Sequence, residues 1–355
     1  MMKKIVSAVK VLPDISIKEA LKKIDEVGHR ILFVCDEKDT LIGSLTDGDI
    51  RRRILKTGNL QEKIATCYNP NPTFMIKGRC SFDEIKALML KKMLDVIPIV
   101  DMTGSITEII FWDSLFNKKD LVHDRLANVP VAIMSGGKGK RLDPFTKILP
   151  KALMPVHEKP ILEIIIDKFY RFGVKNFYVT LNYRGEMVRT YFESIEKKYK
   201  MHYIWEKNFS GTAASLKLLP PDIPETFIIS NCDVIVDLDY PDLMRFHAEN
   251  RNILTVVGSI QHYTIPYGII KFEQKGKIKE IKEKPELDFT VNAGVYILDR
   301  KALSAIPANR NFDMTELINL LLEKGDNVGV YPVSQKSYVD IGQWEKYREY
   351  IERTM

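Results

Sequence analysis

Apolar and polar positions follow one pattern that occurs twice in the first 125 residues. Each copy predicts a helix, a strand, a turn, a second strand and the start of another helix. The first copy predicts a helix at 16–24, strands at 30–36 and 41–45 and a helix from 46; the second predicts a helix at 81–89, strands at 96–101 and 105–106 and a helix near Trp112. The pattern therefore indicates two tandem β-α-β-β-α units, at about 1–62 and 63–125.

The pattern changes after this repeat. Residues 121–129 are polar and lead into Pro130, which predicts a linker. From Val131 onward, strand and helix patterns alternate, which predicts an α/β domain over 129–355 with a mixed, mostly parallel sheet. Phosphate ligands bind at the strand ends of such sheets.

A candidate phosphate site follows the first apolar run of this second part. Residues 129–134 predict a buried strand, and Gly136, Gly137 and Gly139 follow it. Glycines at that place let backbone N–H groups approach a polyphosphate and form an anion-binding nest. Arg141 and Lys151 supply cations that can stabilise charge on a transferring phosphoryl group.

The same stretch matches neither a Walker loop nor the dinucleotide-binding glycine fingerprint. It reads Gly136-Gly-Lys-Gly-Lys-Arg-Leu-Asp-Pro-Phe-Thr146, followed by Pro150-Lys-Ala-Leu-Met-Pro155. It closely resembles the signature of the sugar-1-phosphate nucleotidyltransferases, G-G-x-G-x-R-L-x-P-x-T…P-K-x-L-x-P. The resemblance implies a Rossmann-like, GT-A-like nucleotidyltransferase domain.

Further motifs of that family follow in the family's order. They are Gly211-Thr212-Ala, Asp233 at the end of the apolar run 227–233, Pro266-Tyr-Gly268, Glu283-Lys284-Pro, Asn292-Ala-Gly294 and Asp340. The resemblance implies that Gly211 and Thr212 bind the nucleotide. It also implies that Gly268, Glu283, Lys284, Asn292 and Gly294 line the sugar-phosphate pocket. Taken singly, these short motifs also occur in ordinary turns, and 275–286 also fits a solvated hairpin.

The implied reaction explains the residue types. A sugar-1-phosphate oxygen attacks the α-phosphorus of a nucleoside triphosphate, and pyrophosphate leaves in line. This chemistry needs positioning and charge neutralisation rather than a covalent nucleophile. We expect Asp233 and Asp340 to share Mg²⁺, a hard cation that binds carboxylate and phosphate oxygens. Lys151 and Lys284 then hold the sugar phosphate while Arg141 neutralises the pyrophosphate.

Glu206 bears on the choice of base, because it lies five residues before Gly211. Pyrimidine-using members of the family place Gln at that spacing, whereas its guanylyltransferases resemble this chain in having Glu. An ionised carboxylate only accepts hydrogen bonds, and guanine offers adjacent N1–H and N2–H₂ donors. We therefore expect GTP. The alternative is that Glu206 pairs with Lys207 or another cation outside the pocket.

The repeated first part resembles a pair of cystathionine-β-synthase (CBS) domains. That family binds adenosine ligands through G-h-x-T/S-x-x-D, which the first repeat retains as Gly43-Ser-Leu-Thr46-Asp-Gly-Asp49. The second repeat has Ile110 where the carboxylate belongs. The resemblance implies AMP, ADP or ATP at Thr46 and Asp49. The alternatives are that Thr46 only caps a helix and that the CBS pair serves only as a dimerisation surface.

A CBS pair before such a transferase resembles the glucosamine-1-phosphate guanylyltransferases of bacterial legionaminic acid synthesis. That resemblance implies glucosamine 1-phosphate as substrate and GDP-glucosamine as product. Mannose 1-phosphate with GTP and glucose 1-phosphate with dTTP remain open. So does a protein of another class, an adenine-nucleotide sensor with a degenerate transferase half, although Arg141, Lys151, Asp233 and Asp340 are intact.

Composition narrows the partners and the location. The net charge of +6 is mild and spread along the chain, which argues against nucleic acid as a partner. No apolar run approaches the roughly 20 residues of a membrane span, and Lys10 interrupts the amino-terminal apolar stretch, so we expect no signal peptide. Four cysteines without C-x-x-C spacing indicate reduced thiols. We expect a cytoplasmic homo-oligomer that contacts no membrane.

Overall fold

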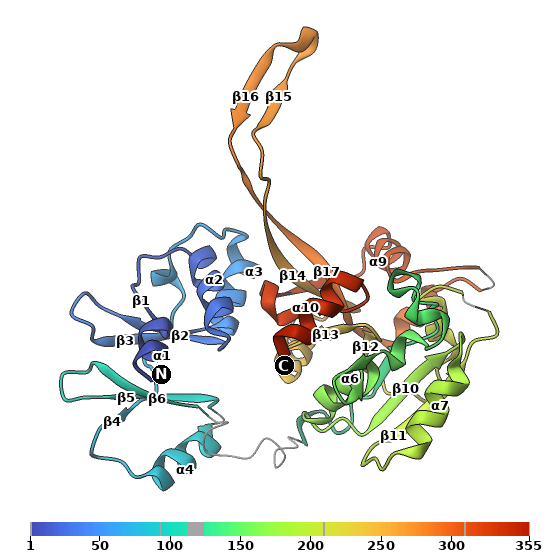
Figure 1. The fold of residues 1–355 in the computed structure, drawn as a ribbon, viewed down its shortest axis with the longest axis horizontal. Coiled ribbons are helices and arrows are strands. Elements are labelled where there is room, and N and C mark those ends of the chain that lie inside the picture. The colour runs from blue at the N-terminus through green and yellow to red at the C-terminus, as the bar shows by residue number, and fades with distance from the viewer. Residues whose placement is uncertain (1, 93, 112–123, 209, 309, 355) are drawn as a thin grey trace. The chain divides into compact units, whose positions relative to one another are not determined.

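The chain folds into two compact units, residues 1–121 and 122–355. The structure is a computed structural model that describes residues 2–92, 94–111, 124–208, 210–308 and 310–354. Figure 1 shows both units as mixtures of helices and strands.

The first unit contains two small sheets with the same construction. Its helices are α1 (Met2–Val9), α2 (Ile17–Val27), α3 (Asp47–Thr57) and α4 (Phe82–Lys92); its strands are β1 (Lys10–Val11), β2 (Ile31–Cys35), β3 (Leu41–Thr46), β4 (Met75–Ile76), β5 (Val96–Val100) and β6 (Ile106–Phe111). The strand orders are β1-β2-β3 and β4-β5-β6. β1 pairs parallel with β2 and β4 pairs parallel with β5, whereas β3 and β6 pair antiparallel with β2 and β5. The internal repeat of the sequence thus corresponds to a repeated sheet. The helix predicted near Trp112 lies outside the described residues.

Local sequence signals begin and end the helices of this unit. The Ser16 hydroxyl accepts a hydrogen bond from the Glu19 N–H, and the Glu19 carboxylate accepts one from the Ser16 N–H. This reciprocal arrangement is a capping box, which satisfies amide donors at the start of α2. The helix ends at Gly28, whose φ of 75° lies in the left-handed region that glycine adopts without strain.

The second unit is built on one seven-stranded sheet. Its helices are α6 (Ile161–Tyr170), α7 (Gly185–Ser194), α8 (Tyr240–Glu249), α9 (Met314–Glu323) and α10 (Trp344–Thr354). Its strands are β7 (Val131–Met134), β8 (Pro155–Val156), β9 (Lys159–Pro160), β10 (Asn176–Leu181), β11 (Lys200–Trp205), β12 (Thr226–Asn231), β13 (Val234–Val236), β14 (Leu254–Thr264), β15 (Ile269–Phe272), β16 (Ile278–Lys282), β17 (Glu286–Asp299), β18 (Val328–Val333) and β19 (Tyr338–Asp340). The sheet order is β11-β10-β7-β12-β17-β14-β18, and only β17 runs antiparallel to its neighbours. The predicted mixed, mostly parallel sheet is confirmed.

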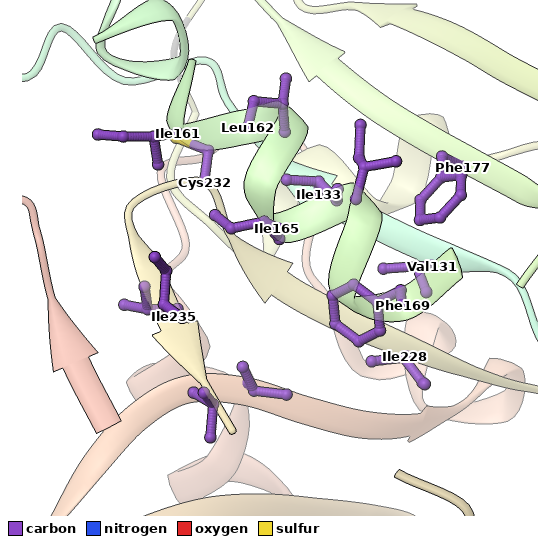
Figure 2. Packing of buried hydrophobic residues seen from close by; sticks show 14 of the residues in the cluster. Val131, Ile133, Ile161, Leu162, Ile165, Phe169, Phe177, Ile228, Cys232 and Ile235 are labelled. Carbon is purple, nitrogen blue, oxygen red and sulfur yellow. The ribbon is translucent and has the colours of Figure 1, made fainter. Parts of the chain in front are cut away.

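Helices cover both faces of this sheet because its central strands are apolar on both sides. On β7, Val131 and Ile133 pack in a cluster with α6, α7, α8 and α10, whereas Ala132 and Met134 pack in a second cluster with α9. Figure 2 shows part of the first cluster, in which Ile165 and Phe169 of α6 lie over β7. The two cores hold β7 and its neighbours in fixed register, and so position the loops at the strand ends.

The predicted linker is partly wrong. Leu126 is only 3% exposed and packs in the first of these cores. Its N–H donates to the Phe172 carbonyl at 2.9 Å. Residues 124–129 therefore belong to the folded second unit, because an apolar side chain within a polar stretch anchors them. None of the described helices has the length and apolar character that crossing a bilayer requires.

Candidate functional site

The carboxyl ends of four neighbouring parallel strands meet at one edge of the large sheet. Glu206 follows β11, Gly136 follows β7 and Asp233 follows β12. Register places Met134 beside Asn231, so the β7 and β12 loops begin side by side. The edge beyond the carboxyl ends is where open α/β sheets bind ligands. The structure thus brings the predicted phosphate loop and the predicted metal carboxylate together.

Two carboxylates and two cations form the centre of the site. Asp233 is 5% exposed, and its Oδ2 accepts a hydrogen bond from Lys151 Nζ. The Arg141 guanidinium lies 3.9 Å from Asp233 Oδ2 and 3.9 Å from Asp340 Oδ2. The Arg141 side chain is 62% exposed, so it can move onto a bound phosphate with little rearrangement.

A short strand pairing brings the two carboxylates together. β13 pairs antiparallel with β19, so that Val234 lies opposite Asp340. The Ile341 N–H donates to the Asp233 carbonyl at 3.0 Å, and the Gly342 N–H donates to Asp340 Oδ1 at 2.9 Å. A Cβ at Gly342 would collide with Asp233 Oδ2. Glycine is therefore needed beside the carboxylate pair.

The glycine-rich loop packs tightly around Lys151. Gly139 has a φ of 67°, and a Cβ there would lie 2.9 Å from the Thr146 methyl group and 3.0 Å from Lys151 Cβ. The Thr146 hydroxyl donates to the Gly139 carbonyl at 3.0 Å and thereby holds the turn closed. A Cβ at Gly137 would meet nothing within 4 Å. The backbone at Gly137 is therefore the open part of the loop, where a phosphate can approach.

Glu206 lies behind the same loop. It is 6% exposed, and its Oε2 is buried without a hydrogen-bond partner in the described structure. Burial raises the pKa of the Glu206 carboxyl above its ordinary value. Hydrogen bonds from the Thr180 hydroxyl and the Ser210 N–H lower this pKa, but the effect of burial is larger. A Cβ at Gly136 would lie 2.6 Å from Glu206 Oε1. Gly136 therefore allows the glycine-rich loop to touch the buried carboxylate.

The Gly211-Thr212-Ala loop is held by a residue that the sequence analysis missed. Asp313 Oδ1 accepts from the Thr212 N–H at 2.9 Å, and the Thr212 hydroxyl accepts from the Met314 N–H at 3.0 Å. Gly211, with a φ of 94°, approaches the Phe312 carbonyl too closely for a side chain. Asp313 also forms a capping box with Glu316 at the start of α9. The Asp-x-x-Glu spacing was the available sequence signal.

One of the three predicted sugar motifs lies beside the carboxylate centre. Asn292 Oδ1 accepts from the Gly294 N–H at 2.9 Å, and Asn292 Nδ2 donates to the Tyr296 hydroxyl at 2.9 Å. Gly294 has a φ of 71° and faces the Asn231 side chain, two residues before Asp233. Asn292 and Gly294 are therefore near the centre, although the Asn292 amide is already engaged.

The structure does not bring Gly268, Glu283 and Lys284 to this centre. All three are exposed on the ribbon that continues from β14 and β17 (Figure 1). Gly268 and Glu283 face each other there, since a Cβ at Gly268 would lie 2.8 Å from Glu283 Oε2. Lys284 has a φ of 41°, an unusual conformation for a residue with a side chain. Their role in sugar binding stays a prediction.

In the first unit, Thr46 and Asp49 are hydrogen-bonded to each other. Thr46 caps α3, its hydroxyl accepts from the Asp49 N–H at 3.2 Å, and the Thr46 N–H donates to Asp49 Oδ2 at 2.8 Å. Arg52 pairs with the other Asp49 oxygen at 2.6 Å. In the second repeat, Thr107 lies within β6 and donates to the Ile99 carbonyl. The helix-capping role of Thr46 is therefore present, whether or not a nucleotide also binds.

Comparison with known proteins agrees with this architecture. The sequence profile described as "Nucleotidyl transferase" matches residues 131–355, and the CBS domain profile matches residues 1–56. The crystal structure of HddC from Yersinia pseudotuberculosis has a TM-score of 0.52 and 22% sequence identity, covering 64% of this chain and 100% of that chain. This likeness concerns the fold.

Among curated relatives, a UTP–glucose-1-phosphate uridylyltransferase of Synechocystis sp. is 26% identical over 246 residues, covering 62% of this chain and 63% of the relative. The mannose-1-phosphate guanylyltransferase catalytic subunit beta of Danio rerio is 30% identical over 220 residues, covering 59% of this chain and 60% of the relative. The chain thus spans about three fifths of the length of these relatives. With more than half of its residues matched by the profile, this chain belongs to the nucleotidyl transferase family, with a CBS domain before the transferase domain.

Proposed function

We propose that this protein is an enzyme that transfers a nucleotidyl group from a nucleoside triphosphate to a sugar 1-phosphate and releases pyrophosphate. The convergence of Asp233, Asp340, Arg141 and Lys151 at one strand edge carries the proposal. The names of the curated relatives support a sugar 1-phosphate as acceptor. A degenerate transferase half is disfavoured, because the residues that the chemistry requires lie within contact of one another.

The residues at the centre supply charge neutralisation and positioning. Lys151 and the exposed Arg141 provide positive charge where negative charge develops on the transferring and leaving phosphates. The loop at Gly137 offers backbone N–H groups to the triphosphate. Holding both substrates in line accounts for much of the barrier reduction in such reactions.

Asp233 and Asp340 would hold Mg²⁺. No group of three or more metal-ligating side chains occurs among the described residues. A carboxylate pair suits Mg²⁺, which is usually bound through one or two carboxylates together with substrate phosphates and water. When bound, the ion would neutralise phosphate charge. The pairing of β13 with β19 supports this role, since it presents both carboxylates to the same space.

The base proposed is guanine. Glu206 supports this assignment, because its carboxylate lies against Gly136 of the glycine-rich loop and its Oε2 has no hydrogen-bond partner in the described structure. The two donors of guanine suit a carboxylate, which only accepts. The guanylyltransferases among the relatives agree with GTP, whereas the uridylyltransferase indicates that the family also uses other bases.

The sugar proposed is glucosamine 1-phosphate, with GDP-glucosamine as product for legionaminic acid or a related surface glycan. The combination of a CBS domain and a transferase domain in one chain supports it. Mannose 1-phosphate is the main alternative, because the Danio rerio relative is named for it. A cytoplasmic location is proposed with it, in keeping with cysteines that form no disulfide in the described structure.

A substrate panel tests the proposal. The full chain with MgCl₂ is incubated with GTP, dTTP, UTP or ATP and with glucosamine, N-acetylglucosamine, mannose or glucose 1-phosphate, while pyrophosphate release is followed. We expect the highest kcat/KM for GTP with glucosamine 1-phosphate. No release with any pair would overturn the proposed reaction, and a preference for UTP or dTTP would overturn the base assignment.

Arg141→Ala is expected to lower kcat by roughly 10²–10³-fold, the scale for removing one preorganised group that stabilises transition-state charge. The measurement is steady-state kinetics with both substrates saturating. Arg245→Ala is the matched control, because the Arg245 side chain is 63% exposed on α8, close to the 62% of Arg141, and pairs with Asp242. A variant that raises KM with unchanged kcat would mean that Arg141 contributes uniform binding instead.

The CBS unit is proposed to bind an adenine nucleotide at Thr46 and Asp49 and to change the substrate affinity of the transferase domain. Coupling between two such sites is typically about 5–150-fold in affinity. Asp49→Ala should abolish AMP, ADP or ATP binding measured by calorimetry, along with any kinetic effect. Because Asp49 also completes the cap of α3, Glu19→Ala, which opens the equivalent cap of α2, is the control for loss of stability alone. No heat with any of the three nucleotides in the wild type would leave the CBS unit a structural role.

A further inference from the structure

A long two-stranded ribbon leaves the large sheet from the edge that carries the site. β14 pairs with β18 as far as Ser259, and β17 pairs with β12 as far as Val295. β14 and β17 pair with each other both within the sheet and beyond these points, where they form a two-stranded ribbon. The ribbon continues into the β15–β16 hairpin. We call residues 260–290 the arm, which Figure 1 shows extending away from the sheet.

The arm carries two uncovered apolar patches, one in the β14–β17 ladder and one in the outer hairpin. Tyr263 lies opposite Leu287 in the β14–β17 ladder, and Phe289 is on the same face two residues further along β17. They are 57%, 44% and 47% exposed. In the outer hairpin, Ile270 lies opposite Ile281 and Phe272 lies opposite Ile278, and all four are more than half exposed. The opposite face of the ribbon carries polar pairs such as His262 with Asp288.

A bare ribbon of this kind needs a partner. An isolated two-stranded hairpin is marginally stable in water, and exposed apolar patches mark interaction sites. Residues 266–289 contain six lysines and five carboxylates, so the arm has almost no net charge. The near-neutral charge does not suit a nucleic acid or an anionic membrane, and it does suit a protein surface.

The arm also carries Lys284 away from the site of its own chain. Gly294 lies eight residues after Glu286 along one continuous strand, a span of about 26 Å at the usual rise of about 3.3 Å per residue. Lys284 lies just beyond the end of this ladder, at a bend where Ile265 donates to the Pro285 carbonyl. The left-handed φ of 41° at Lys284 is a strain of the kind found at functional positions.

A matching apolar surface borders the site. The Phe145 and Trp344 rings stack at 5.1 Å and are 46% and 42% exposed, and Ile148 close by in sequence is 71% exposed. Phe145 lies four residues after Arg141, and Trp344 follows Gln343, whose side chain donates to Asp340 Oδ2 at 2.9 Å. We call Phe145, Ile148 and Trp344 the apolar rim.

We propose that the arm of one copy docks its exposed apolar residues on the apolar rim of a second copy, and that its Lys284 completes the sugar-phosphate pocket there. The contact is reciprocal, so two arms and two rims form a closed two-fold dimer. A second copy is the partner because it supplies what the arm lacks in its own chain: an apolar surface beside Asp233 and Asp340 within reach of Lys284. The role of Lys284 rests on the proposed function, whereas the docking does not.

Site-specific photocrosslinking tests the docking without using activity. A benzophenone amino acid replaces Phe272 in the full chain, and a normal preparation is mixed with a heavy-nitrogen-labelled one before illumination. We expect crosslinked peptides that join the arm to residues 145–148 or 344 and that combine light and heavy chains. The proposal would be overturned if no crosslinked peptide joined a light chain to a heavy chain. It would also be overturned if no crosslink joined the arm to the apolar rim.

A paired substitution gives the energetic test. Ile270→Glu should raise the dimer dissociation constant, measured by sedimentation, at least about 30-fold, since it places a charge in a buried contact. Leu322→Glu is the matched control, because Leu322 on α9 is also 53% exposed and lies outside the arm and the rim. Docking through the arm would be contradicted if both substitutions raised the dissociation constant equally, or if neither substitution raised it.

Complementation tests the shared pocket. Asp233→Asn and Lys284→Ala proteins should each be nearly inactive alone. Mixed in equal amounts, they should recover about a quarter of wild-type turnover, because half of the dimers are mixed and each has one complete site. A mixture as inactive as its parts would overturn the role of Lys284 across the dimer. An inactive wild type would instead refute the proposed reaction, and the crosslinks would still decide the docking.

Discussion

Asp233→Asn is expected to lower kcat by more than about 10³-fold, because losing a carboxylate that would hold Mg²⁺ would forfeit several kcal/mol of transition-state stabilisation. The side chain is 5% exposed and contacts Lys151 and Arg141, so its charge bears on all the groups of the centre. Steady-state kinetics with GTP and a sugar 1-phosphate would measure the loss. Asp340→Asn should lower kcat to a similar extent, and excess EDTA should lower the activity of the wild-type protein equally.

Two controls separate this effect from misfolding. Asp222→Asn changes an exposed carboxylate in a loop outside the site and should leave kcat unchanged. Circular dichroism and thermal unfolding should show that Asp233→Asn is folded, since Asn preserves the volume of the side chain. Full activity in Asp340→Asn, or activity that resists EDTA, would remove the metal role from the pair.

Glu206→Gln is expected to change the choice of nucleotide. A site built to hydrogen-bond a substrate rejects one that cannot reproduce those bonds by up to about 10⁴–10⁵-fold, and we expect the GTP-to-UTP ratio of kcat/KM to fall by roughly 10³-fold. The Glu206 carboxylate lies against the glycine-rich loop, and its Oε2 has no hydrogen-bond partner in the described structure. A glutamine amide both donates and accepts, which suits the mixed edge of uracil or thymine.

The measurement is kcat/KM for GTP, UTP and dTTP with one sugar 1-phosphate. Glu225→Gln is a suitable control, because Glu225 is an exposed residue that precedes β12 at the opposite end of the strand from the site. Unchanged ratios in Glu206→Gln would place Glu206 outside the base pocket. Lower rates with all three triphosphates, at constant ratio, would assign it a structural role beside Gly136.

Much of the site could be predicted because strand ends leave clear sequence signals. The apolar run before Gly136 and the one before Asp233 became β7 and β12, neighbours in the sheet. Parallel neighbours bring their carboxyl ends together, so the distant loops had to meet. The approach of Asp340 depends on β13 and β19, which have three residues each. Pairings this short leave little periodic pattern, and family resemblance alone indicated that Asp340 belonged there.

The arm could not be predicted from motif order. Pro266-Tyr-Gly268 and Glu283-Lys284-Pro suggested a pocket, and the charged run 275–286 suggested a hairpin. The length of the ladder decides where those motifs lie, and it depends on the pairing of β14 with β17. Alternation of apolar and polar residues identifies two strands but does not tell how far beyond the sheet they pair.

The reaction itself is tested most directly by following oxygen atoms. The full chain is incubated with Mg²⁺, GTP and glucosamine 1-phosphate whose phosphate oxygens are heavy, and the products are analysed by mass spectrometry. Attack of the sugar phosphate on the α-phosphorus of GTP predicts a GDP-sugar that retains every heavy oxygen, together with one unlabelled pyrophosphate per product. Heavy oxygen in pyrophosphate or inorganic phosphate, or no nucleotide-sugar with any sugar 1-phosphate and triphosphate, would contradict the account.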